Sequence, residues 1–221
     1  MIDTQYLLPM AIFVDTADIE LAKAAKELGW VRGITTNPTL LAQSENPVED
    51  TIRQLAELGT GLLFYQLFAT SIEDMIKEAA RVKKIVGDQL VLKIPPTEPG
   101  FQVISFLPSE IPCCITAVYS VAQAIVAREI GVRYIAVYVN RATKLLGDGM
   151  GILADMATVL KGSQTQILAA SLKSPSEAGA AILSGACHLT LPFDVLRTLT
   201  AHEYSDEAVR QFNAHGSGIR R

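Results

Sequence analysis

One lysine lies inside an apolar segment, residues 89–96 (QLVLKIPP), that has the pattern of a short buried strand. On strand periodicity Lys93 shares a face with Val91, and the two prolines that follow end strand pairing just beyond it. Burial disfavours the ammonium form of a lysine, and the neutral amine is a nucleophile toward carbonyl groups. The segment therefore predicts an imine-forming lysine. The alternative is a structural lysine that extends to the rim or pairs with a carboxylate.

Polar residues recur at the ends of the other predicted strands, where we expect them to act on or bind a substrate. They are Asp15, Thr36, Asn37, Gln66, Thr116, Tyr138, Asn140, Arg141, Ser171 and Lys173. Any single Thr, Ser or Asn at such a position is more often a cap or a strand terminator. Seven apolar strands that each end in a hydrogen-bonding or ionisable group are harder to explain in that way, because such groups are costly to bury without a use. The pattern favours one shared site.

This set of side chains suits covalent chemistry on a carbonyl. It contains one buried amine, and it lacks a paired-carboxylate site, a metal-ligand set and a Ser-His-Asp order. An imine on Lys93 would act as an electron sink, so that a neighbouring carbon–carbon bond could break or form. Tyr138 or Asp15 could move the required proton, directly or through a bound water. Arg141 and Lys173 could hold a phosphate, although either could also be an ordinary solvated charge.

Eight strand patterns alternate with helical patterns along the whole chain. The predicted strand segments are residues 10–15, 31–38, 61–69, 89–96, 113–120, 132–141, 165–175 and 186–196, the last of which is a strand with an immediate helix. This alternation, without a linker, predicts an α/β protein made of one (β/α)8 TIM barrel domain over residues 1–221. A glycine-bearing loop is expected at 145–151 and a last helix at 206–214, with a mobile tail over 210–221. An open doubly wound sheet is the alternative if the strand at 113–118 fails, although no glycine-rich dinucleotide fingerprint follows the first strand.

Composition narrows the class of protein. Hydrophobic residues make up 49% of the 221 residues, charged residues 19%, and the mean hydropathy is +0.28, which favours buried strands and an oligomer interface. The net charge is −4 and no basic tract exceeds Arg220–Arg221, so we expect no nucleic-acid partner. No apolar run is long enough to span a membrane, and the N-terminal stretch has Asp3 but no Lys or Arg, unlike a signal peptide. We expect a cytoplasmic protein.

The cysteines and histidines do not form a ligand pattern. Cys113, Cys114 and Cys187 are an odd count without metal-ligand spacing, and the first two lie in an apolar run typical of buried free thiols. The three histidines are also scattered. We therefore predict no metal site and no catalytic thiol.

Several motifs together resemble one known family. They are DTAD (15–18), GITTNPTLL (33–41), FYQLFATS (64–71), VLKIPPT (91–97), TAVYS (116–120), AVYVNR (136–141), LAASLKSP (168–175) and LTLPFDV (189–195). In this order they resemble the transaldolase family, most closely its short members, the fructose-6-phosphate aldolases, over residues 12–212. The resemblance implies a class I, cofactor-free (β/α)8 barrel. It also implies a homo-oligomer, a ring of five or a paired decamer, in which the last helix reaches a neighbour.

The resemblance also implies roles for individual residues. Lys93 would form the imine with a ketose carbonyl, Asp15 and Asn37 would contact the donor hydroxyls, and Thr116 would help to hold a catalytic water. The residues implied to bind the acceptor phosphate are Arg141, Ser171 and Lys173.

Two positions distinguish the branches of the family. Gln66 and Tyr138 are similar to the aldolase branch, where these side chains position the proton-transferring water, whereas transaldolases carry Glu and Phe; Ala136 matches the aldolases in the same way. The expected reaction is therefore cleavage or formation of a ketose phosphate such as fructose 6-phosphate from dihydroxyacetone and glyceraldehyde 3-phosphate. One alternative is a transaldolase that passes the dihydroxyacetone unit between sugar phosphates. An alternative of another class is a non-catalytic phosphosugar-binding barrel, which has no need of a desolvated lysine.

Overall fold

The eight predicted strands form a closed parallel barrel in sequential order, β1 to β8, with β8 pairing back to β1. The computed structural model describes residues 10–219, so the N-terminal stretch that carries Asp3 and the pair Arg220–Arg221 lie outside the described residues. The strands are β1 (Ala11–Asp15), β2 (Val31–Thr35), β3 (Leu62–Gln66), β4 (Leu90–Ile94), β5 (Cys113–Val118), β6 (Tyr134–Tyr138), β7 (Gln166–Ala170) and β8 (His188–Leu191). The predicted fold class is confirmed, and the open-sheet alternative is wrong because β5 pairs with both of its neighbours.

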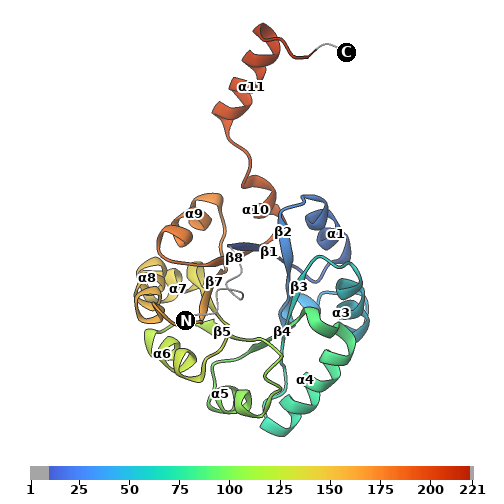
Figure 1. Cartoon of the computed structure of the whole chain (residues 1–221), viewed down its shortest axis with the longest axis vertical. Helices are drawn as coiled ribbons and strands as arrows, with labels where there is room; N and C mark the ends of the chain where they lie inside the picture. The colour runs from blue at the N-terminus through green and yellow to red at the C-terminus, as the bar shows by residue number, and fades with distance from the viewer. Residues whose placement is uncertain (1–9, 220–221) are drawn as a thin grey trace.

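Helices surround the ring of strands, and Figure 1 shows the last helix, α11, standing apart from it. The helices are α1 (Ile19–Glu27), α2 (Pro38–Leu41), α3 (Val48–Glu57), α4 (Ile72–Val86), α5 (Glu98–Val103), α6 (Val121–Ile130), α7 (Val139–Leu146), α8 (Gly149–Leu160), α9 (Pro175–Leu183), α10 (Phe193–Thr198) and α11 (Glu203–His215). Short 3-10 turns follow α4 at Gly87–Gln89 and α5 at Ile104–Phe106. Side-chain caps begin several of the helices. Asp18 accepts from Leu21 N–H at 2.9 Å and Ser71 accepts from Asp74 N–H at 3.1 Å.

Two predicted boundaries differ from the structure. The expected glycine loop at 145–151 is mostly helical, because Asp148 caps α8 and Thr143 accepts a hydrogen bond from Gly149 N–H, which closes the α7–α8 junction within two residues. The last helix begins at Glu203 rather than 206, where His202 Nδ1 accepts from Tyr204 N–H, and it runs to His215. Residues 210–215, expected in a mobile tail, are therefore helical.

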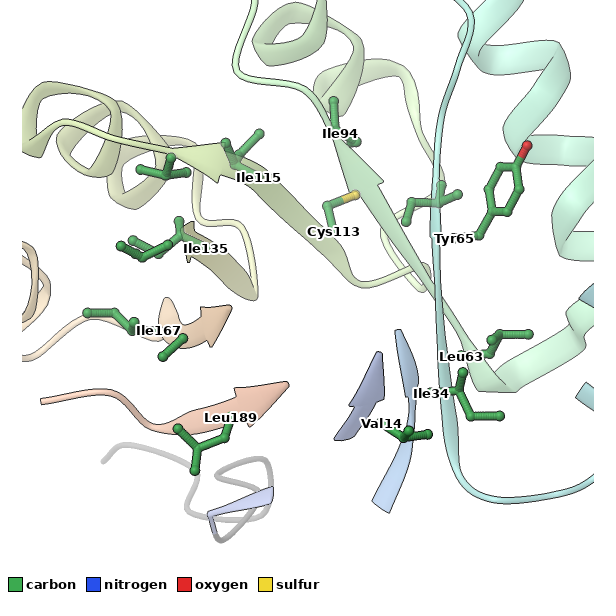
Figure 2. Close-up of a cluster of buried hydrophobic side chains, with 14 of the residues drawn as sticks. Val14, Ile34, Leu63, Tyr65, Ile94, Cys113, Ile115, Ile135, Ile167 and Leu189 are labelled. Carbon is green, nitrogen blue, oxygen red and sulfur yellow. The ribbon is translucent and has the colours of Figure 1, made fainter. Parts of the chain in front are cut away.

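The barrel has two apolar layers that follow strand alternation. One layer fills the interior: Ala11, Phe13, Phe64, Val91, Cys114, Tyr134, Ala136 and Leu168. The alternate residues form a second layer between strands and helices, part of which Figure 2 shows, with Tyr65 pointing away from β3 toward a neighbouring helix. Because Val91 belongs to the interior layer, Lys93 two residues later also faces into the barrel.

The interior layer ends on a buried histidine near the amino ends of the strands. His188 is fully buried; its Nδ1 accepts from Ala11 N–H at 3.1 Å, so the ring proton lies on Nε2 and donates to Gln166 Oε1 at 3.1 Å. Burial, with a smaller contribution from the nearby charge of Arg133, lowers the pKa of His188 to about 4 from an ordinary 6.5. The neutral ring is thus part of the folded core.

We expect the free energy of unfolding to fall as the pH drops from about 6.5 to about 4, the window set by the two pKa values of His188. In this pH range the unfolded chain binds a proton at His188 and the folded chain does not. The pKa difference is equivalent to about 3 kcal/mol of unfolding free energy. Urea unfolding at pH 7 and pH 4.5 checks this result. His188→Gln, which replaces the imidazole by an amide that can still donate and accept but cannot titrate, should lose that part of the pH dependence. An unchanged slope in this variant would contradict the assignment.

Candidate active site

A cavity of about 400 Å³ opens at the carboxyl ends of the strands. It is lined by all the sequence-predicted site residues except Thr36, Thr116 and Asn140: Asp15, Asn37, Gln66, Lys93, Tyr138, Arg141, Ser171 and Lys173. These residues come from strands and loops all round the barrel, as expected when the strands close into a ring. Asn37 also caps α2, where its Oδ1 accepts from Leu40 N–H at 3.0 Å.

Lys93 is held inside the barrel with its amine at the cavity. Its side chain is 4% exposed, and Nζ donates to the carbonyl oxygen of Thr36 at 2.6 Å. In the sheet it lies between Gln66 on β3 and Cys114 on β5. No carboxylate pairs with Lys93 among residues 10–219. The structural alternative, a lysine that reaches solvent or sits in an ion pair, does not describe this geometry.

Two of the predicted residues that do not line the cavity, Thr36 and Thr116, lie directly behind it. The Thr36 hydroxyl donates to the carbonyl of Phe64 at 2.9 Å, so only the backbone carbonyl of Thr36 reaches the site. Thr116 is fully buried, and its hydroxyl oxygen lies 3.4 Å from the phenol oxygen of Tyr138. Thr116 therefore orients Tyr138.

The ring of Tyr138 is clamped on two further sides. The ring of Tyr119 meets it edge to face at 6.0 Å between centroids, and the guanidinium of Arg141 lies 4.9 Å from its centroid. Tyr119 was not among the predicted site residues. The phenol is thus presented to the cavity in one orientation.

Two further threonines were missed by sequence reasoning. Thr35, the last residue of β2, is fully buried and donates to Asp15 Oδ1 at 2.7 Å; its oxygen also lies 2.5 Å from that of Thr190 on β8. Thr190 lines the cavity. Strand alternation was the available signal: Ile34 packs in the layer between strands and helices, so Thr35 faces inward and Thr36 does not.

The cationic side of the cavity is braced by one carboxylate. Glu177 Oε1 accepts from Asn140 Nδ2 and Oε2 accepts from the backbone N–H of Lys173, both at 2.8 Å. This bridge ties the start of α7, which carries Arg141, to the loop after β7. Asn140, predicted at a strand end, serves this bridge and does not line the cavity.

Backbone strain is concentrated at the same cavity. Ala117 (φ 55°) and Ser171 (φ 61°) are the residues other than glycine with positive φ in the described part of the chain, and both line the cavity. A left-handed conformation costs a residue with a Cβ about 1–2 kcal/mol. Strain of this kind is typical of functional sites.

The thiol next to Lys93 is chemically quiet. Burial raises the pKa of Cys114 to about 12, and that of Cys113 likewise, so both remain protonated thiols near neutral pH.

Within residues 10–219 no three His, Cys, Asp or Glu side chains gather closely enough to hold a metal ion. No described helix has the length and apolar character needed to cross a membrane.

The chain has the architecture of the (β/α)8 barrel enzymes, which carry their active sites at the carboxyl ends of the strands. Its cavity lies at that end and surrounds a buried lysine. The family model for transaldolase/fructose-6-phosphate aldolase matches residues 12–217, and the chain belongs to this family. A probable transaldolase of Geobacter sulfurreducens is 34% identical over 206 residues, which cover 92% of this chain and 96% of that protein. A probable transaldolase of Hydrogenobaculum is 33% identical over 206 residues, which cover 92% of this chain and 94% of that protein.

Solved structures resemble the chain at the level of the barrel. A mandelate oxidase superimposes with a TM-score of 0.64 at 16% identity, covering 93% of this chain and 70% of that one. A thiamine phosphate pyrophosphorylase of Pyrococcus furiosus superimposes with a TM-score of 0.59 at 16% identity, covering 95% and 98%. At these identities the likeness concerns the fold alone.

Proposed function

We propose that the protein is a class I aldolase that cleaves or forms a ketose phosphate such as fructose 6-phosphate through an imine on Lys93. The observation that carries the proposal is the amine of Lys93, which is buried to 4% exposure, faces the cavity and has no carboxylate partner among the described residues. Burying a lysine in this way is costly unless its amine is used. A non-catalytic binding barrel would have no such use for it.

In the proposed reaction the Lys93 amine attacks the ketose carbonyl carbon, and loss of water leaves a protonated imine. The bond that then breaks joins the carbon next to the imine carbon to the hydroxyl-bearing carbon beyond it, and its electron pair moves toward the imine to give an enamine. The hydroxyl on the departing carbon loses its proton and becomes an aldehyde. Tyr138, oriented by Thr116, takes this proton directly or through a water held with Gln66 and returns it to the enamine carbon. Hydrolysis of the imine then releases dihydroxyacetone and frees Lys93.

A second candidate is transaldolase activity, which the names of the relatives favour. In that reaction the enamine is not protonated and attacks an acceptor aldose phosphate. Gln66 and Tyr138 favour protonation, because both line the cavity and supply a neutral amide and a phenol rather than Glu and Phe. We therefore place the chain on the aldolase side.

One paired assay distinguishes the two reactions. The protein is mixed with fructose 6-phosphate alone, and again with an added aldose phosphate acceptor, and both free glyceraldehyde 3-phosphate and the transfer product are measured. An aldolase releases the aldehyde with no acceptor present. Release that depends on the acceptor would assign the protein as a transaldolase.

Arg141 gives a prediction about the phosphate. If its guanidinium binds the acceptor phosphate, Arg141→Ala should raise KM for phosphorylated acceptors by about 10- to 100-fold, the loss expected for a charge-assisted hydrogen bond. Unphosphorylated acceptors should change much less, through the lost contact with the Tyr138 ring alone. Steady-state kinetics with matched phosphorylated and unphosphorylated aldehydes measure both values. Equal losses on the two would assign Arg141 a structural role.

We also propose a cytoplasmic homo-oligomer in which α11 packs on a neighbouring copy. No residue of α11 is buried, and Tyr204, Val209 and Phe212 are 72%, 54% and 71% exposed. Figure 1 shows α11 extending away from the barrel, beyond α10. Exposed apolar side chains of this size on one helix are typical of an interface. Sedimentation of the full chain, which should give a multiple of 23.8 kDa, tests this proposal; a monomer would contradict it.

A further inference from the structure

The hydrogen bonds of Asp15, Thr35 and Thr190 have a fixed direction. Thr35 donates its single hydroxyl proton to Asp15 Oδ1 at 2.7 Å. The second contact of Thr35, 2.5 Å to the Thr190 oxygen, must then use the proton of Thr190. Each hydroxyl has one proton, and both are committed within the chain Thr190 to Thr35 to Asp15.

This direction determines what Thr190 offers to the cavity. With its proton committed to the fully buried Thr35, the Thr190 oxygen presents only lone pairs to the space that it lines. Asp15 on the neighbouring strand β1 lines the same cavity and also offers only acceptors. The wall formed by β8 and β1 therefore requires hydrogen-bond donors from whatever occupies the cavity.

The position of this wall indicates which group it would meet. In the closed ring β8 lies directly opposite β4, the strand that carries Lys93. The donors Arg141 and Lys173 follow β6 and β7, on one side of β8 in the ring, whereas Asp15 lies on β1 on the other side of β8. A small hydroxyketone joined to Lys93 carries hydroxyl groups on the carbons next to its carbonyl carbon. In a cavity of about 400 Å³ these hydroxyl groups are the donors that can reach the acceptor wall.

We propose that Thr190 accepts a hydrogen bond from a hydroxyl of the ketone bound at Lys93, and that Thr35 positions both Thr190 and Asp15 for this contact. The inference rests on the proposed function and adds a specificity-determining residue to it. A hydroxyketone is thereby favoured over a ketone without hydroxyl groups. The selection operates before any carbon–carbon bond is broken.

The test is reductive trapping by borohydride at increasing concentrations of two ketones, dihydroxyacetone and acetone. Thr190→Val should raise the half-saturating concentration of dihydroxyacetone by about 5- to 20-fold, the loss expected for one hydrogen bond in a closed site. Acetone, which has no hydroxyl, should be trapped by the variant as by the wild type. Thr190→Ser, which keeps the hydroxyl, should restore trapping of dihydroxyacetone to within about twofold.

Each other outcome has a definite meaning. Equal changes for both ketones, or no change for either, would overturn the role of Thr190 while leaving the imine at Lys93 intact. If the wild type is trapped by neither ketone, the proposed function fails and the inference with it. Thr35→Val should also raise the half-saturating concentration of dihydroxyacetone. In the double variant the increase should be smaller than the two single increases combined, because both residues act through one hydrogen-bond chain. Thermal unfolding of each variant confirms that the barrel is retained.

Discussion

Lys93→Met is expected to abolish cleavage, by on the order of 10⁴-fold or more, and to abolish reductive trapping altogether. Met fills a similar volume without an amine, and the lysine gives up only one hydrogen bond, to the carbonyl of Thr36. The fold should therefore survive, as circular dichroism and thermal unfolding would show. Activity is measured as release of glyceraldehyde 3-phosphate from fructose 6-phosphate.

The matched control for this variant is the other lysine of the cavity. Lys173→Met removes an amine from the same site, yet it should leave trapping of dihydroxyacetone at Lys93 unchanged. If trapping survives in Lys93→Met and disappears in Lys173→Met, the imine forms on the wrong lysine for the proposed mechanism. Substantial cleavage by Lys93→Met would remove the imine mechanism itself.

Tyr138→Phe is expected to slow aldol cleavage by about 10²- to 10⁴-fold, the usual range for lost acid–base help. The ring and its contacts with Tyr119 and Arg141 remain in this variant, so the loss reports on the phenol oxygen next to Thr116. Imine formation at Lys93 should be largely intact. Transfer to an added aldose phosphate should fall less than cleavage, because transfer does not require protonation of the enamine.

Tyr119→Phe is the control for the tyrosine substitution. It removes a phenol from the ring that packs against Tyr138, but Tyr119 does not line the cavity, so cleavage should change little. Both products are measured in the same reaction for each variant. Cleavage that stays within about threefold in Tyr138→Phe, far inside the expected range, would mean that the proton is carried elsewhere and would count against the aldolase assignment.

The position of Lys93 was predictable because local rules agree there. Apolar alternation sets which face of the strand it occupies, and two prolines set where the strand ends, so its depth in the barrel follows without tertiary information. The closed barrel followed in the same way from eight alternating strand and helix patterns. Whether Lys93 had a partner could not be known before the strands were placed.

Thr35 and Thr190 were harder to predict. The TTNP segment offers two adjacent threonines, and the packing of Ile34 against the helices decides that Thr35 faces Asp15 while Thr36 bonds the backbone of Phe64. Thr190 lies between two leucines on a short strand, and its meaning comes entirely from a contact 155 residues away in the chain. The loop predicted at 145–151 was wrong for a similar reason, since the junction of α7 and α8 depends on the contact between Thr143 and Gly149.

The most direct test of the account is the intact mass of the wild-type protein after borohydride reduction in the presence of dihydroxyacetone, followed by peptide mapping. The imine mechanism predicts one added unit per chain, equal to dihydroxyacetone less one oxygen, because water is lost and two hydrogens are gained. It predicts this unit on the peptide that carries Lys93, the buried amine of the cavity. An unchanged mass, or a modification confined to any other lysine, would contradict it.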